Sequence, residues 1–335
     1  MNNFKKIGMS ALAASLVSTS AFAGELTASG SASVTMEGFS STALESNTAF
    51  SMGDSVYLTG STELDNGMTV SMSFELDGVN EGGSSAYDNN SLTVSSDSLG
   101  TITFAAHGGS SASTAIDTTA AGDIMDNFDD VVTVLGGNSA AVQANLTKEA
   151  GTGNNSIYYT LPSMVDGLSV SASLSTSSSQ TGSTGNNAIG YNAVYTGVEG
   201  LSIAYGIADI ETGAAASDGD QTVMSASYAY GPVTVAYSNS DYDTGAANTE
   251  ALKQEVSSYA VSYTVSDSIS LTYGSETVES GLAGSIDAEY EKLSASYTAG
   301  GMTLTITSQD AENIDHGTNA DEDYEYWSLG LSFAF

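Results

Sequence analysis

The feature that most constrains the fold of this chain is a period-two alternation that recurs along most of its length. In residues 68–76, 233–237, 269–273 and 302–307, large apolar side chains occupy one parity, and small or hydroxyl side chains occupy the other. Because successive side chains of a strand point to opposite faces, the pattern predicts strands with one apolar and one small, polar face. Helical periodicity is scarce, and no apolar run has the length of a membrane-spanning helix.

The alternating segments number sixteen. They start near residues 26, 55, 68, 91, 101, 156, 168, 188, 201, 222, 233, 256, 269, 290, 302 and 324. Seven short connections between them carry turn residues such as Asn66-Gly67 and Gly231-Pro232. The eight longer connections lie at 39–53, 78–89, 108–154, 176–187, 211–220, 241–254, 279–288 and 310–322. Short and long connections therefore alternate along the chain.

This organisation predicts an all-β fold, a transmembrane antiparallel β-barrel of 16 strands with short periplasmic turns and long outer loops. In hydrocarbon every backbone N–H and C=O must be paired, so a sheet can span a membrane only if it closes on itself. The lipid then contacts the apolar parity, and a water-filled lumen accepts the polar one. A soluble β-sandwich or a β-solenoid is the alternative, but its packed core needs larger inward side chains than Ser, Thr and Gly.

The N-terminus predicts export. Lys5 and Lys6 precede an apolar stretch at 7–20, and Ala21-Phe22-Ala23 forms a small-residue cleavage signal. We expect residues 1–23 to be a signal peptide and residues 24–335 to be the barrel. The chain has 40 acidic and 5 basic residues and no Cys, which excludes nucleic acid as a partner and excludes any Cys-based metal site or disulfide framework.

The C-terminus carries the most specific local signal. Apolar residues occupy every second position up to the final Phe, as expected for a last strand that faces lipid. This predicted outer-membrane assembly signal consists of Trp327, Leu329, Leu331, Phe333 and Phe335. An ordinary terminal strand that closes a sheet is the alternative.

Several short segments together resemble the general bacterial porins, a Gram-negative outer-membrane family. Residues 33–38 (Ser-Val-Thr-Met-Glu-Gly) resemble the first strand of that family, and residues 58–68 resemble its second hairpin. Residues 99–104 and 155–159 are similar to the strands that flank its pore loop, and the chain ends in Phe335. The resemblance implies a 16-stranded barrel that assembles as a homotrimer, with the third loop folded inward to narrow the lumen.

The longest connection, 108–154, stands at the position of that third loop. An inward fold would explain its apolar stretch at 131–135, whereas an ordinary acidic surface loop is the alternative. The predicted pore constriction combines acidic residues of this loop with two from the facing wall. These residues are Asp117, Asp123, Asp126, Asp129, Asp130, Glu63 and Glu75.

The sequence departs from the porin pattern in one respect. The family commonly sets an arginine cluster opposite the acidic loop, and this chain contains no Arg. His107 stands near the loop entrance, and Lys292 is the one cation expected in the lumen. A field of a single, negative sign is therefore expected there.

An enzyme is not indicated, because neither His107 nor His316 lies in a recognisable catalytic arrangement. His316 lies in an acidic segment that offers oxygen ligands for Ca²⁺ but lacks the spacing of a loop site, so a solvated charge run is the alternative. The acidic residues of this segment are Asp310, Glu312, Asp315, Asp321, Glu322 and Asp323. No other cofactor is expected.

These observations predict a cation-selective, water-filled channel in the outer membrane, through which ions and small hydrophilic solutes diffuse passively. Its partners would be the lipid bilayer, cations and small solutes, and two further copies of the chain. Two alternatives remain open at this point. One is a secreted acidic β-rich adhesion or surface-layer protein, and the other is a structural outer-membrane barrel without a general pore.

Overall fold

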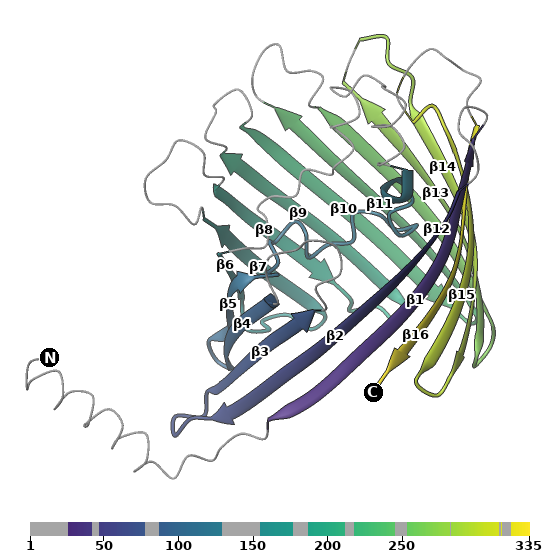
Figure 1. Cartoon of the computed structure of the whole chain (residues 1–335). Coiled ribbons are helices and arrows are strands. Elements are labelled where there is room, and N and C mark those ends of the chain that lie inside the picture. The colour runs from purple at the N-terminus through teal and green to yellow at the C-terminus, as the bar shows by residue number, and fades with distance from the viewer. Residues whose placement is uncertain are drawn as a thin grey trace, which may run out of the picture.

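The computed structural model describes residues 26–41, 47–77, 87–128, 155–176, 187–211, 218–244, 253–281, 283–314, 316 and 323–335. The chain forms a closed antiparallel barrel in which each strand pairs with its sequence neighbours (Figure 1). Its strands are β1 (Thr27–Ser41), β2 (Asn47–Glu63), β3 (Thr69–Asp77), β4 (Tyr87–Ser96), β5 (Gly100–His107), β6 (Ser156–Thr160), β7 (Leu168–Ser175), β8 (Asn187–Tyr195), β9 (Leu201–Glu211), β10 (Gly219–Tyr230), β11 (Val233–Thr244), β12 (Gln254–Ser266), β13 (Ile269–Ser280), β14 (Ala288–Ala299), β15 (Met302–Glu312) and β16 (Asp323–Ala334). The sixteen predicted strands are thereby confirmed. The predicted signal peptide, residues 1–23, lies outside the described residues.

Closure is made by the first and last strands. β1 pairs with β16 from Ser31 opposite Ala334 to Ser41 opposite Tyr324, so the sheet has no open edge. On the outer face of this seam, the indole of Trp327 occupies the space where a Cβ of Gly38 would lie. The barrel thus satisfies the backbone pairing that hydrocarbon demands of a spanning sheet.

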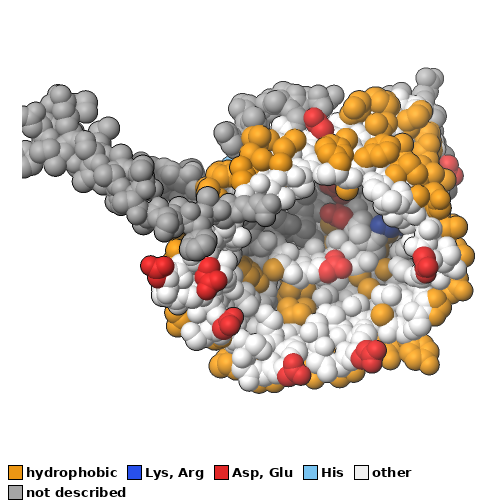
Figure 2. All heavy atoms as spheres, turned by 90° about the horizontal axis from the view of Figure 1, so that it is seen from below, with side chains coloured by type: hydrophobic (Ala, Val, Ile, Leu, Met, Phe, Trp, Pro, Cys, Tyr) orange, Lys and Arg blue, Asp and Glu red, His pale blue; other side chains and the backbone are white. Residues whose placement is uncertain are grey.

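The two faces of the wall follow the alternation of the sequence. Leu293 and Ile306 point outward and are 60% and 55% exposed, as expected for side chains that lipid would cover. Tyr237 and Tyr259 also lie on the outer parity, with ring centroids 4.9 Å apart. The lumenal parity carries mainly Ser, Thr, Gly and Ala, so the interior remains a hollow, which Figure 2 shows from the end of the short turns.

The height of the wall varies around the barrel. Strands β3 to β8 have 5 to 10 residues, whereas β9 to β16 have 11 to 13. β1 and β2, with 15 and 17 residues, are the longest described strands. The short turns gather at one end of the barrel, and the strand ends that the longer connections join lie at the other, as the alternating connection lengths predict (Figure 1).

The predicted boundaries differ most from the structure at the first long loop. Residues 39–53 were expected to form the first long loop, but β1 continues to Ser41 and β2 begins at Asn47. Phe50 and Met52 extend the apolar parity of β2 upward and lie opposite Met36 and Val34. Paired extended backbone satisfies its hydrogen bonds there, so the two strands continue into residues that were predicted to be loop.

The described part of the chain holds a single short helix, the 3₁₀ turn η1 (Met125–Phe128). Within the described residues, no helix is long and apolar enough to cross a membrane.

Candidate pore constriction

The connection between β5 and β6 folds into the barrel. We call its described part, residues 108–128, loop 3. At its start, the backbone of Ala112 is held by two wall side chains: its N–H donates to Ser173 Oγ on β7 at 2.7 Å, and its C=O accepts from Asn192 Nδ2 on β8 at 2.7 Å. Figure 1 shows this segment inside the ring of strands. The inward fold of this connection is therefore confirmed for residues 108–128.

The middle of loop 3 follows the wall across the barrel. The N–H of Ala120 donates to Ser238 Oγ on β11, and the N–H of Ala121 donates to Ser258 Oγ on β12, both at 2.8 Å. Each wall hydroxyl thus satisfies a loop N–H that would otherwise be buried without a partner.

Glu276 of β13 makes the next attachment. Its side chain is fully buried, and Oε2 accepts from the N–H of Ile124 at 2.7 Å and of Met125 at 3.3 Å. Oε1 accepts from Ser258 Oγ at 3.1 Å. One carboxylate therefore joins the loop backbone to two strands of the wall.

The end of the described part of loop 3 docks through an aromatic side chain. Phe128 is 1% exposed, and its ring centroid lies 6.1 Å from Phe39 of β1, 5.7 Å from Tyr290 of β14 and 6.4 Å from Tyr326 of β16. The neighbouring Asn127 donates to Gln309 of β15 at 3.1 Å. Residues 108–128 are thus fastened to the wall at their start, middle and end.

The predicted acidic residues of the loop divide into two groups. Asp117, Asp123 and Asp126 are exposed on loop 3, whereas Asp129 and Asp130 lie outside the described residues. Asp117 Oδ1 accepts from the N–H of Thr119 at 3.1 Å, which fixes a local turn. Desolvation, together with the negative charge of Asp126, raises the pKa of Asp123, and the cation of Lys292 opposes that rise. The structure therefore brings Asp123 and Asp126 within electrostatic reach of each other.

The two predicted wall acids lie apart from each other. Glu63 is exposed and pairs with Thr69 beside the turn between β2 and β3, at the short-turn end. Glu75 lies opposite Tyr57, whose side chain hydrogen-bonds to it. Both face the lumen by parity, yet Glu63 stands at the mouth of the barrel rather than beside loop 3.

The sequence reasoning missed two lumenal carboxylates that have clear hydrogen-bond partners. Glu276 is the buried anchor of loop 3, and Glu37 of β1 accepts from Tyr326 Oη at 2.7 Å. Both stand on the small, polar parity of their strands, and this parity was the available signal. Their partners are distant in sequence, so the alternation alone could not assign them a role.

The basic residue of this region is Lys292 on β14. Its Nζ donates to the C=O of Gly122 in loop 3 at 3.2 Å. Away from loop 3, the lumenal face of β1 to β5 presents hydroxyl groups rather than cations. They include Ser29, Ser31, Ser33, Thr35, Ser55, Thr59, Ser71, Ser73, Ser91, Thr93, Thr101 and Thr103. Figure 2 accordingly shows a hollow lined mostly by uncharged side chains, with acidic groups and a basic group inside.

The two histidines have different settings. His107 ends β5 at the entrance to loop 3 and is exposed. His316 is buried, and its Nδ1 lies 2.9 Å from the C=O of Ile286. It therefore joins the connection after β15 to the one before β14, which is a structural role.

The acidic segment around His316 is described only in part. Asp310 and Glu312 project from the outer face of β15 and are exposed, and Asp323 begins β16. Asp315, Asp321 and Glu322 lie outside the described residues. Among the residues that are described, no three acidic or histidine side chains gather into a group that could hold a metal ion.

The apolar residues of the last strand lie on the outer wall. Trp327, Leu329 and Phe333 are 44%, 39% and 40% exposed, and Phe335 is 76% exposed. Leu331 shares their parity and pairs with Val34 of β1. The arrangement suits contact with lipid; the assembly role of these residues stays a prediction.

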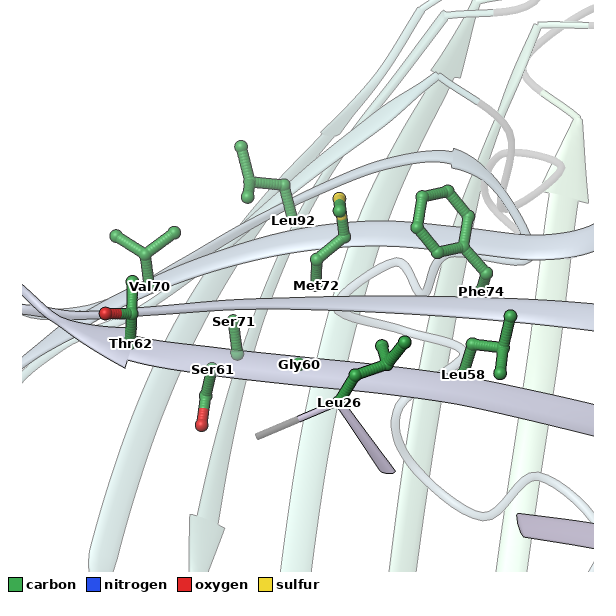
Figure 3. A pocket seen from close by; sticks show the side chains of 10 residues that line it. All are labelled: Leu26, Leu58, Gly60, Ser61, Thr62, Val70, Ser71, Met72, Phe74 and Leu92. Carbon is green, nitrogen blue, oxygen red and sulfur yellow. The ribbon is translucent and has the colours of Figure 1, made fainter. Parts of the chain in front are cut away.

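The outer wall also has an apolar hollow over β2 to β4. It is lined by side chains of β2, β3 and β4 such as Leu58, Met72 and Leu92, with Leu26 at its edge (Figure 3). A second hollow continues past Phe104 of β5 toward β6. These hollows face away from the lumen and take no part in the constriction.

Comparison with known proteins agrees with this geometry. A family model described as Gram-negative porin matches residues 9–281. No curated protein matches the sequence. Among solved structures, the anion-selective porin from Comamonas acidovorans is 16% identical with a TM-score of 0.68, over 93% of this chain and 99% of that one. A refined porin structure is 17% identical with a TM-score of 0.64, over 93% and 100%. OmpF of Salmonella typhi, solved with daunomycin, is 12% identical with a TM-score of 0.64, over 93% and 98%.

At these identities the solved structures establish the fold, whereas the family model covers most of the chain. The closed barrel and the family match together exclude the alternative of a secreted adhesion or surface-layer protein. The chain therefore belongs to the Gram-negative porin family, whose members are non-enzymatic outer-membrane channels for solutes.

Proposed function

We propose that this porin is a cation-selective, water-filled channel for passive diffusion of ions and small hydrophilic solutes. The supporting observation is that Asp117, Asp123 and Asp126 are exposed on the loop that crosses the lumen, while β1 to β5 offer hydroxyl groups. A lumen of one charge sign concentrates counter-ions and repels co-ions. Asp129, Asp130, Glu63 and Glu75 belong to the same proposal.

The position of the acids matters more than their total number. Electrostatic screening acts over about 8 Å at physiological ionic strength, so carboxylates at the narrowest section dominate over those outside it. The similarity to an anion-selective porin shows that this fold is compatible with the opposite preference. Selectivity is therefore expected to follow the lumenal charges rather than the barrel itself.

The test is the reversal potential of single channels in a planar bilayer across a KCl gradient. Wild type is expected to favour K⁺, and joint Asp→Asn changes at 117, 123 and 126 are expected to reduce that preference. Asp310→Asn with Glu312→Gln is the matched control, because these two carboxylates point outward from β15. An anion-preferring wild type would contradict the proposal, and an equal effect of the control would remove loop 3 from it.

The assembly and export of the chain are also proposals. A homotrimer is supported by the family and by the apolar outer wall of β2 to β4, which a second copy would cover (Figure 3). Native mass measurement in mild detergent is expected to give three copies, and only monomer would contradict this. Cleavage after Ala23, leaving residues 24–335 as the barrel, is tested by the N-terminal sequence of the protein from outer membranes.

A further inference from the structure

The wall beneath loop 3 lacks side chains at three places. Gly190 of β8, Gly206 of β9 and Gly274 of β13 each lie under a residue of the loop. A Cβ at Gly274 would stand 2.6 Å from Ala121 Cβ and 3.2 Å from Ala121 Cα. Carbon atoms in contact are about 3.5–4.0 Å apart, so a methyl group at Gly274 cannot coexist with the loop where it lies.

The other two glycines have the same relation to the start of the loop. A Cβ at Gly206 would stand 2.7 Å from Ile116 Cδ1, and Ile116 is only 3% exposed, so its side chain has little room to turn away. A Cβ at Gly190 would stand 3.0 Å from Ser173 Oγ of the neighbouring strand and 3.3 Å from Ala112 Cβ, so its conflict with the loop is milder. All three positions therefore let the loop approach the wall more closely than any side chain would allow.

The polar side chains that hold loop 3 act on the same loop residues. Ala112 is bound by Ser173 and Asn192, and Ala121 is bound by Ser258. These hydrogen bonds of 2.7–2.8 Å need the loop backbone close to the strands. The missing side chains and the hydrogen bonds therefore fix one depth for the loop.

We propose that Gly190, Gly206 and Gly274 are positioning residues that set the aperture of the pore. Because these glycines have no side chains, the lumenal wall has a shallow depression at these positions, and residues 112–121 pack into it. A side chain at any of them pushes the loop away from the wall, into the water-filled lumen. The size limit for solutes then depends on residues that no passing solute touches. The inference rests on the channel function of the family and not on the proposed cation selectivity.

The decisive variant is Gly274→Ala, since its clash is with backbone and Cβ atoms rather than with a flexible side chain. Relief of a 2.6 Å contact requires a shift of the loop by about 1 Å. Single-channel conductance and the rate of uptake of uncharged sugars of increasing size are expected to fall from wild type to Gly274→Ala and further in Gly274→Val. Gly190→Ala is expected to have the smallest effect.

Gly330 of β16 provides the matched control. It faces the lumen by parity, and a Cβ there would have no atom within 4 Å. Gly330→Ala adds the same methyl group to the wall away from loop 3 and is expected to leave conductance unchanged. Heat-dependent migration on gels selects folded protein for every comparison.

A second change supplies a partial rescue. Ala121→Gly removes the Cβ that the new methyl group meets at 2.6 Å but leaves Ala121 Cα at 3.2 Å, so Gly274→Ala with Ala121→Gly is expected to recover part of the lost conductance. Wild-type conductance in folded Gly274→Ala, an increase in conductance, or an equal loss in Gly330→Ala would each overturn the inference. If Gly274 variants do not fold, Gly206→Ala and Gly190→Ala carry the same comparison.

The test of the aperture inference is independent of the test of the proposed cation selectivity. A change of aperture alters the conductance and the size limit for uncharged solutes, whereas the cation preference is read from the reversal potential. Wild type that favours anions would refute the selectivity proposal and leave the aperture inference standing. Unchanged conductance in the glycine variants would refute the aperture inference and leave the selectivity proposal standing.

Discussion

Removal of the Glu276 side chain is expected to loosen loop 3 without opening the barrel. Glu276→Ala leaves the N–H groups of Ile124 and Met125 without the carboxylate that accepts from them at 2.7 and 3.3 Å. A buried donor left without a partner costs about 1–3 kcal/mol. Because the second contact is long, we count mainly the first and take about 2 kcal/mol, the middle of this range, as the loss in docking free energy.

This loss has a measurable consequence. Since 1.4 kcal/mol corresponds to a factor of ten, about 2 kcal/mol raises the population of undocked loop roughly 30-fold. The expected readout is an increase in brief current fluctuations of single channels at fixed voltage. Glu276→Gln keeps a carbonyl oxygen that can accept from the N–H of Ile124, so its channels should show far fewer brief current fluctuations than Glu276→Ala channels.

Glu75→Ala is the control, because it also removes a lumenal carboxylate but one that pairs with Tyr57 on the neighbouring strand. It should leave the current as steady as in wild type. A Glu276→Ala channel as steady as wild type would refute the reasoning, and so would equal noise in the Glu276→Gln and Glu276→Ala channels.

Two further predictions concern charge in the lumen. Because desolvation and Asp126 raise the pKa of Asp123, this carboxyl loses its charge at a higher pH than an ordinary Asp. The cation preference of wild type should therefore begin to decline at a higher pH than that of Asp123→Asn, as followed by reversal potentials over a pH series; identical onsets would contradict this. Lys292→Met removes the cation that contacts Gly122 and should increase the preference for K⁺, and a decrease would argue against a lumenal role for this charge.

The sequence by itself determined the fold of this protein. Its alternation fixes which side chains of each strand meet lipid, and closure follows because hydrocarbon offers no partner for a free sheet edge. The alternating lengths of the connections place the turns at one end. Even the misplaced first loop obeys the same rule, since Phe50 and Met52 continue the apolar parity into the part expected to be loop.

The candidate site was determined only in part by the sequence. Composition indicated acidic groups and no Arg, and the longest connection indicated which loop would enter the barrel. Which carboxylates face water and which one binds the loop could not be predicted, because these roles depend on contacts between distant segments. Asp123 and Glu276 have the same kind of side chain, yet one is exposed in the lumen and the other is fully buried.

Only the tertiary structure decided where loop 3 lies. Ile124 and Glu276 are separated by 152 residues, and Ala121 meets Gly274 across a similar distance in sequence. Strand alternation is a local property with a period of two, so it records which face a residue occupies but not what lies against that face. The depth of the loop, and with it the aperture, arises because the folded barrel brings small wall residues and hydrogen-bond acceptors under one segment of backbone.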